Sequence, residues 1–300
     1  MSLISLMGAV EIGLIFALVA LGVLISFRIL NFPDLTADGS FPLGGAVAAT
    51  LIAGGHDPWL ASAIAALAGA AAGWVTAWLN VRLNILQLLA SILVMIALYS
   101  INLRIMGAPN IPLIGEPTVF AQFIGESGEN AWLIQPGLLA AIIVAAKLGL
   151  DFFFASQLGL AMRATGANPR MARAQGISTD RAILSGMALS NALIALAGAL
   201  YVQTQGGADI SMGVGTIVIG LAAVIIGETL IPSRTLWIIT LATVLGAILY
   251  RLFIALALTA DFIGLQAQDL NLITALLVGF ALVLPNIKAK LRKKSGGNAA

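Results

Sequence analysis

Long apolar segments recur along this chain, and their length constrains the fold more than any other feature. A helix that crosses the hydrocarbon core of a bilayer needs about 20 mainly apolar residues. Long candidates are Gly8–Leu30, Trp59–Val81, Ile85–Met106, Trp132–Leu150, Ala182–Val202, Leu236–Leu258 and Leu270–Pro285. Two further segments, Pro42–Gly55 and Gly213–Pro232, are shorter and rich in glycine. Each either crosses the membrane fully or is a re-entrant segment that returns to the side from which it entered. We therefore expect an all-α, polytopic transmembrane helical bundle of about nine membrane segments, two of them short.

The composition supports this expectation. Only 9% of the 300 residues are charged, whereas a soluble domain carries roughly 25%. With so few charges, a water-soluble fold would expose large apolar patches, which soluble proteins avoid. The chain has no cysteine and a single histidine, His56, so neither a disulfide framework nor a Cys or His metal cluster is expected. We predict one transmembrane domain over residues 1–300, without metal or cofactor.

Positive residues predict the orientation, because short cytoplasmic loops are enriched in Lys and Arg. The loop at 157–181 holds Arg163, Arg170, Arg173 and Arg181, and the tail at 286–300 holds Lys288, Lys290, Arg292, Lys293 and Lys294. The loop Gly107–Ala131 instead carries Glu116, Glu126 and Glu129 and has no Lys or Arg. We expect a cytoplasmic C-terminus, with the acidic loop and the N-terminus outside.

The two short segments resemble each other in sequence. Asp38-Gly-Ser40-Phe-Pro42-Leu-Gly44 and Asp209-Ile-Ser211-Met-Gly213-Val-Gly215 share the pattern D-x-S-x-[P/G]-x-G. In the orientation predicted above, the first segment begins on the cytoplasmic side of the membrane and the second on the outer side. This is typical of inverted repeats whose short broken helices line a solute path, here with repeats at about 8–150 and 182–285. The candidate path residues are Asn31, Asp38, Ser40, Gln203, Gln205, Asp209 and Ser211.

An alternative for Asp38 and Asp209 is purely structural. An Asp or Ser just before a helix caps its free N–H groups, so each aspartate is either a path residue or an ordinary N-cap.

The basic loop contains signals for a short helix. Asn168 followed by Pro169 is an N-cap with proline at the first helical position, and Gly176 is a stop signal. The helix between them would have about seven residues, too few to be stable alone. Its own protein or a partner must therefore hold it.

This loop carries a family resemblance. The pattern Arg163-Ala-x-Gly166-x-Asn168-x-x-x-Ala172-x-x-x-Gly176-Ile177 resembles the cytoplasmic coupling loop of ABC-importer permeases, in the branch that serves branched-chain amino acids, ribose and related sugars. Asn31-Phe32 and the stretch from Gly220 to Gly227 are similar to other motifs of that branch. Pro33-Asp34-Leu35 stands where the branched-chain group usually shows Ala-His-Gly. The closer likeness is to a subgroup with members linked to aromatic amino acids.

The resemblance implies a permease subunit of an ATP-binding-cassette importer in the bacterial inner (plasma) membrane, carrying an amino acid. Its partners would be an ATPase subunit, an extracytoplasmic solute-binding protein, a second permease copy and membrane lipid, with no nucleic acid. The sequence contains no G-x-x-x-x-G-K-[ST] phosphate loop, so ATP hydrolysis would occur on another chain and this one is not an enzyme. The implied ATPase-coupling residues are Arg163, Gly166, Asn168, Pro169, Arg170, Arg173, Gly176 and Ile177.

Three alternatives stay open. The same class of permease serves sugars or nucleosides. An ion-coupled secondary transporter needs an intramembrane carboxylate, for which Glu11 is the one deep candidate. An intramembrane enzyme is the weakest alternative, because G-x-S-x-G and H-E-x-x-H are both absent. Three other charged residues lie in or near spans. Arg104 is close enough to the end of its span to extend its charged group to the membrane surface. Glu228 is expected in a loop, and Arg251 is a candidate partner of Asp261.

Overall fold

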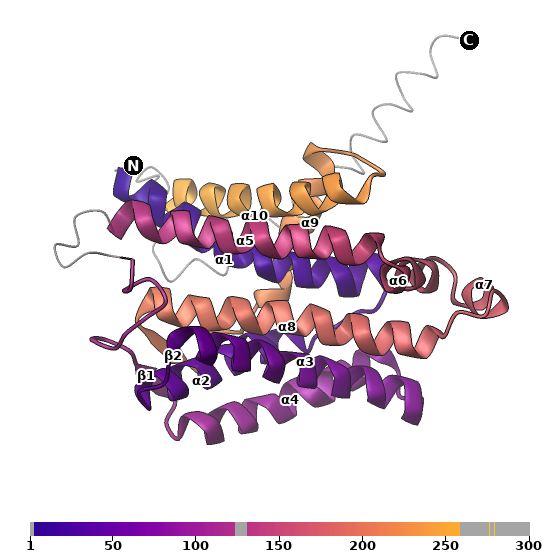
Figure 1. Ribbon diagram of the computed structural model, residues 1–300, viewed down its shortest axis with the longest axis horizontal. Coiled ribbons are helices and arrows are strands. Elements are labelled where there is room, and N and C mark those ends of the chain that lie inside the picture. The colour runs from indigo at the N-terminus through magenta and orange to yellow at the C-terminus, as the bar shows by residue number, and fades with distance from the viewer. Residues whose placement is uncertain (1–2, 124–130, 259–275, 277–278, 280–300) are drawn as a thin grey trace, which may run out of the picture.

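A computed structural model describes residues 3–123 and 131–258, together with Leu276 and Gly279 (Figure 1). Its helices are α1 (Leu3–Val23), η1, a π-helical continuation of α1 (Leu24–Ile29), α2 (Ala37–Ala53), α3 (Pro58–Leu83), α4 (Gln87–Met106), α5 (Ala131–Ala155), α6 (Gln157–Ala167), α7 (Pro169–Ala174), α8 (Thr179–Gln205), α9 (Thr216–Leu230) and α10 (Leu236–Leu258). Two short strands are β1 (Asn110–Pro112) and β2 (Gly207–Asp209).

Six helices in the described part of the chain are long and apolar enough to cross a membrane. They are Ser5–Ile29, Pro58–Leu83, Gln87–Met106, Leu133–Ala155, Thr179–Gln205 and Leu236–Ala257. Each corresponds to one of the long predicted segments, so those predictions are confirmed. The seventh, Leu270–Pro285, lies outside the described residues apart from Leu276 and Gly279, as do the basic tail, Asp261, Glu126 and Glu129. The total of about nine segments stays a prediction.

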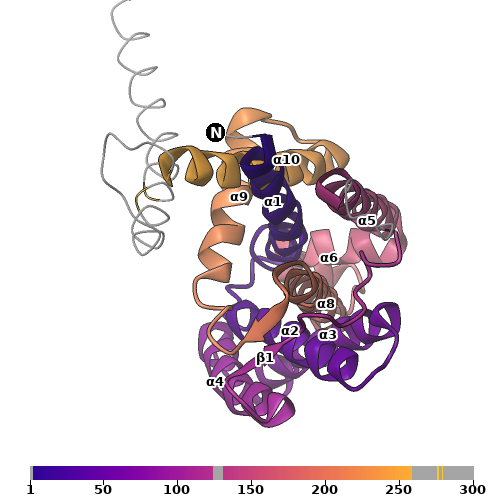
Figure 2. The same cartoon turned by 90° about the vertical axis from the view of Figure 1, so that its left-hand side faces the viewer.

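The bundle is organised around α1 and α8. Figure 2 shows α1 surrounded by α5, α8, α9 and α10. From Gly13 to Val23 its residues are buried, with Ile15, Leu18 and Leu21 all 0% exposed. The peripheral helices instead expose large apolar side chains, including Leu67 of α3 and Ile96 of α4. Such a surface is unsuited to water but matches lipid.

The small residues of α3 form its packing face, as their spacing predicts. Ala61, Ala65, Gly69, Gly73 and Ala77 are all buried. A Cβ added at Gly69 or Gly73 would collide with the backbone of α8. Without side chains between them, the two helices approach at backbone distance, which is how small-xxx-small faces pack in membranes.

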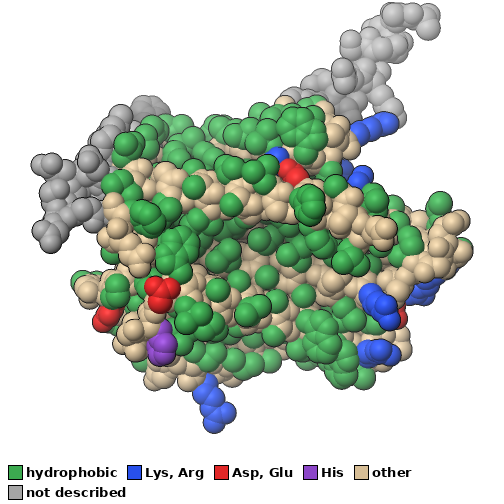
Figure 3. Space-filling model, in the orientation of Figure 1, with side chains coloured by type: hydrophobic (Ala, Val, Ile, Leu, Met, Phe, Trp, Pro, Cys, Tyr) green, Lys and Arg blue, Asp and Glu red, His purple; other side chains and the backbone are tan. Residues whose placement is uncertain are grey.

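The two ends of the bundle differ in charge. Figure 1 places α6 and α7 at one end, the α7 end, and β1, β2 and the start of α1 at the other, the strand end. Most blue side chains visible in Figure 3 gather at the α7 end. Seven arginines lie in the helix ends, short helices and loop at this end of the bundle: Arg28, Arg82, Arg163, Arg170, Arg173, Arg181 and Arg234. Arg104, in the last turn of α4, lies toward the strand end.

Three local features differ from the sequence expectation. α2 begins at Ala37, not Pro42, so Asp38 and Ser40 lie within its first turn rather than before it. The region 157–167, expected as loop, is the helix α6, which Ser156 caps by accepting from the Gly159 N–H (3.4 Å). β1 and β2 form an unpredicted antiparallel ladder that ties the segments after α4 and α8 together.

Candidate functional site

The N-termini of the two short helices, α2 and α9, meet at Asp38. Its Oδ1 accepts a hydrogen bond from the Ile217 N–H (2.8 Å) and its Oδ2 one from the Gly215 N–H (3.3 Å). The first N–H groups of a helix have no partner within it, and their partial positive charge favours a carboxylate. Asp38 therefore caps α9, although it belongs to the first turn of α2.

This contact depends on two neighbouring residues. Pro42 has no N–H to donate to the Asp38 carbonyl within α2. Gly213 packs against that carbonyl and the Pro42 ring, and a Cβ at this position would collide with both. The segment before α9 can therefore lie directly on the first turn of α2.

From Asp38 the two short helices extend toward opposite ends of the bundle. α2 ends beside the last turn of α4, where the Thr50 Oγ1 donates to the Ile105 carbonyl (3.3 Å). α9 ends at the α7 end, where Glu228 pairs with Arg28 of η1 (2.7 Å). Glu228 is thus a helical residue in an ion pair, and the loop position expected for it is wrong.

A buried polar network anchors the start of α2. The Ser40 hydroxyl donates to Asn191 Oδ1 (2.7 Å), and Asn191 Nδ2 donates to Asp34 Oδ2 (2.8 Å). Asp34 Oδ1 accepts from the Thr36 N–H (2.9 Å), and the hydroxyls of Thr36 and Thr76 are 2.8 Å apart. All five residues are at most 1% exposed. Because buried polar groups are costly when unpaired, this network holds α2, α3 and α8 in one arrangement.

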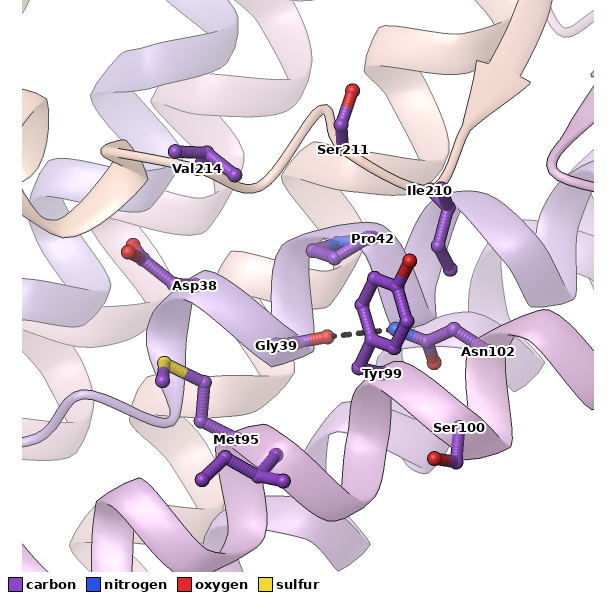
Figure 4. A pocket seen from close by; sticks show the side chains of 11 residues that line it. Asp38, Gly39, Pro42, Met95, Tyr99, Ser100, Asn102, Ile210, Ser211 and Val214 are labelled. Atoms are coloured by element: carbon purple, nitrogen blue, oxygen red, sulfur yellow. Dashed lines mark hydrogen bonds between the residues drawn. The ribbon is translucent and has the colours of Figure 1, made fainter.

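A cavity of about 510 Å³ opens beside this junction, between α2, α4 and the segment that leads into α9 (Figure 4). Its wall is mainly apolar, with a few polar groups. The lining residues are Asp38, Gly39, Pro42, Met95, Ile96, Tyr99, Ser100, Asn102, Ile210, Ser211 and Val214. A mostly apolar pocket with a few converging polar groups is the usual form of a small-molecule site.

The α4 side of this cavity was missed by sequence reasoning. Tyr99 and Asn102 lie three residues apart and therefore on one helix face. Asn102 Nδ2 donates to the Gly39 carbonyl (3.2 Å), whereas its buried Oδ1 has no hydrogen-bond partner among the described residues. The available signal was the group of polar residues Tyr99, Ser100 and Asn102 in the second half of a mainly apolar span.

Two of the predicted path residues, Asp38 and Ser211, line the cavity. Ser40 lies behind it, in the buried network. Asp209 is the last residue of β2, and its carboxylate accepts from the Ser211 N–H (2.7 Å) and hydroxyl, so it turns the chain locally. The two aspartates of the matching pattern therefore make different contacts, and neither caps its own helix.

The other predicted path residues lie away from the cavity. Gln203 is buried, donates to Ser62 Oγ (2.9 Å) and accepts from the Val119 N–H (3.0 Å). Gln205 ends α8 next to β2. Asn31 turns the chain with a φ of +53°, an angle that asparagine tolerates better than most residues, and faces a different cavity at the α7 end.

The second candidate region is α7, whose predicted end signals are both present. Asn168 Oδ1 accepts from the Met171 N–H (3.1 Å), and Pro169 is the first helical residue. Gly176 adopts a φ of +78°, and the Ile177 N–H closes the turn on the Ala172 carbonyl (3.0 Å). The helix spans six residues, close to the expected seven.

The structure also shows what holds α7. α6 packs on the end of the first span, where a Cβ at Gly166 would collide with the Ile29 carbonyl oxygen. On the other side, Arg173 Nε donates to Thr179 Oγ1 at the start of α8 (2.8 Å). The outward residues Arg170 and Met171 are exposed. α7 is thus held in place by α6 and α8 and exposes its outer side chains at the end of the bundle.

Among the described residues, no group of three or more His, Cys, Asp or Glu side chains could hold a metal ion. The lining of the cavity itself offers hydrogen-bonding groups, one carboxylate and an apolar wall.

Comparisons with known proteins agree on one family. The sequence model described as "Branched-chain amino acid transport system / permease component" matches residues 6–284. A tyrosine transport system permease protein of Clostridioides difficile (strain R20291) is 40% identical over 282 residues, which cover 94% of this chain and 91% of that protein. An uncharacterized protein of Rickettsia prowazekii (strain Madrid E) is 33% identical over 92% of this chain and 96% of its own length.

A third relative matches only in part. A nucleoside ABC transporter permease protein of Lactococcus lactis subsp. cremoris (strain MG1363) is 31% identical over 150 residues, 49% of this chain and 42% of that protein. No solved structure matches the chain.

Proposed function

We propose that this chain, which belongs to the family of permease components of branched-chain amino acid transport systems, forms the path by which an ATP-binding-cassette importer carries an amino acid across the bacterial inner membrane. The observation that carries the proposal is the cavity at the meeting point of α2 and α9. Broken helices that meet inside a membrane protein are typical of solute sites, because their free N-termini and irregular backbone supply polar groups.

The chemistry of the cavity favours an amino acid with an apolar side chain, aromatic or branched. The Asp38 carboxylate, which lines the cavity, offers a partner for the ammonium group of an amino acid. Met95, Ile96 and Val214 supply an apolar wall for the side chain. The Clostridioides relative, named for tyrosine transport, supports this class of solute. A nucleoside or sugar is less favoured, since the relative named for nucleosides matches only half of the chain.

In this proposal α7 is the coupling helix, which receives the conformational change of an ATPase on a separate chain. Its six residues are braced by α6 and α8, and they leave Arg170 and Met171 exposed for a partner. A rigid projection suits this role, because a flexible loop would absorb the movement rather than transmit it to the spans. A solute-binding protein would dock at the strand end, and a second copy of the chain would complete the channel as a homodimer.

The charge distribution favours an orientation with the α7 end in the cytoplasm, because Lys and Arg are enriched on that side of membranes. The N-terminus, with β1 and β2, then faces outward. In this orientation α2 runs from the interior toward the outside and α9 from the interior toward the cytoplasm. That opposite arrangement is the one expected of inverted repeats.

Reconstituted transport tests the proposal. The permease, purified with its ATPase and placed in proteoliposomes with the binding protein outside, should take up tyrosine only with ATP inside. Vanadate or a hydrolysis-deficient ATPase should abolish uptake. Uptake by this chain alone, driven by an ion gradient and indifferent to ATP, would establish the ion-coupled alternative instead.

A further inference from the structure

Three adjoining cavities at the α7 end lie apart from the solute site. Their volumes are about 490, 330 and 340 Å³. Each arginine that lines them borders two of the three: Arg28 the first and second, Arg163 the first and third, and Arg234 the second and third. The cavities therefore form one continuous groove, the arginine groove, between η1, α6 and the start of α10.

The carboxylates in the arginine groove already have partners. Glu228 pairs with Arg28 (2.7 Å). Asp151 pairs with Lys147 (2.5 Å) and accepts from the Thr240 hydroxyl (2.7 Å). Arg163 and Arg234 have no ion pair within the described part of the chain. The groove thus carries uncompensated positive charge.

The start of α10 adds to this charge. Thr235 and Leu236 line the groove where α10 begins, so the helix presents free N–H groups and the positive end of its dipole there. Anions, phosphate groups above all, bind favourably at such positions.

The groove is also apolar on one side. Leu24, Phe27 and Ile239 line it next to Arg28 and Arg163. Trp237, in the first turn of α10, lines it and is 54% exposed. Tryptophan at the end of a span is typical of the boundary between hydrocarbon and headgroups. A groove that combines arginine side chains with apolar side chains matches a phospholipid, which has a charged headgroup and apolar acyl chains.

We propose that the arginine groove binds the headgroup phosphate of an anionic phospholipid of the cytoplasmic leaflet, with the acyl chains over the partly exposed Phe27 and Ile239. Basic pockets between membrane helices on the cytoplasmic side bind such headgroups. An acidic segment of a partner protein is the less favoured occupant, because it would leave the apolar wall and Trp237 uncovered. The choice of leaflet rests on the proposed orientation.

Lipid retention measured on the whole purified chain tests this site without ATPase or solute, so its outcome is independent of the transport proposal. The permease is delipidated in detergent and titrated with phosphatidylglycerol or phosphatidylcholine, and bound lipid is counted by native mass spectrometry. We expect preferential binding of phosphatidylglycerol. Arg234→Gln should weaken it by about fivefold, since one basic residue at a membrane surface contributes roughly this factor.

Arg82→Gln is the matched control, because Arg82 lies at the same end in the last turn of α3 but lines none of the three cavities. It should bind phosphatidylglycerol like the unmodified chain. Arg163→Gln, on α6, is a second variant in case the first alters folding, which a thermal unfolding scan would reveal.

Four results would overturn the proposal. One is equal binding of the two lipids, and another is equal weakening by Arg234→Gln and Arg82→Gln. The third is displacement of the lipid by inorganic phosphate at matched concentration, which would assign the groove to free phosphate. If Arg234→Gln binds lipid normally but no longer co-purifies with the ATPase, the groove is a protein interface and the lipid proposal also fails.

Discussion

At the level of single residues, the carboxylate of Asp38 joins two helix starts that are 177 residues apart in the chain. It contributes a negative charge to the cavity and simultaneously accepts from the N–H groups of Gly215 and Ile217. A solute that bound at this carboxylate, as proposed above, would therefore act directly on the contact that holds the start of α9.

Asp38→Asn keeps the shape of the side chain but removes its charge and turns one acceptor into a donor. The carboxamide nitrogen would face an N–H group of α9, and the charge–dipole attraction would be lost, at a cost of about 1 kcal/mol. We expect solute uptake to fall by more than the amount of inserted protein. Asp209→Asn is the control, because Asp209 lies outside the cavity. Equal losses of uptake in both variants would contradict a special role for Asp38.

Gly166 is a second residue whose role depends on a distant contact. Gly166→Ala would place a methyl group against the Ile29 carbonyl oxygen, and α6 would have to move away from the first span. Such overpacking costs about 1–3 kcal/mol. We expect a lower thermal unfolding temperature and less ATPase bound.

Gly149→Ala, in α5, is the matched control for Gly166→Ala. A Cβ at Gly149 meets nothing within 4 Å, and alanine is the better helix former. This variant should be neutral or slightly more stable. A Gly166→Ala protein that unfolds at the unmodified temperature would show that the close contact is unimportant.

Among the elements, α7 is stabilised by its ends rather than by its length. Asn168→Ala removes the N-cap, at a cost of about 1 kcal/mol, and Gly176→Val forces a β-branched residue into a φ of +78°. Both variants should assemble less ATPase in co-purification, or show ATP hydrolysis uncoupled from uptake, while the binding protein keeps its affinity for solute. Normal coupled transport in both would refute the assignment of α7 as the coupling helix.

For the whole molecule, the orientation can be tested directly because the chain contains no cysteine. Single cysteines at exposed positions, Glu116→Cys in the acidic loop and Arg170→Cys in α7, report the two ends of the bundle. A membrane-impermeant maleimide added to spheroplasts should label the first variant at once. It should label the second only after permeabilisation. The reverse pattern would invert the proposed orientation.

Much of the fold could be predicted from the sequence, because the responsible physics is local. About 20 mainly apolar residues in succession favour a span. An N-cap with a following proline marks where a helix begins, although the surrounding structure must still hold so short a helix. The long spans and the ends of α7 were predicted for this reason. The proposed importer mechanism rests instead on family membership, and the proposed solute rests on family membership and on the lining of the cavity.

The functional site was predicted only in part, because its contacts join distant segments. A repeated pattern suggested equal roles for Asp38 and Asp209, but side-chain partners depend on packing that no seven-residue pattern encodes. Asp34 looked like a departure from a motif and proves to be a fully buried member of a hydrogen-bond network. The sequence alone determined the six long apolar spans. Only the tertiary structure decided which polar groups meet inside the bundle, because pairing of buried polar atoms is set by the three-dimensional approach of helices.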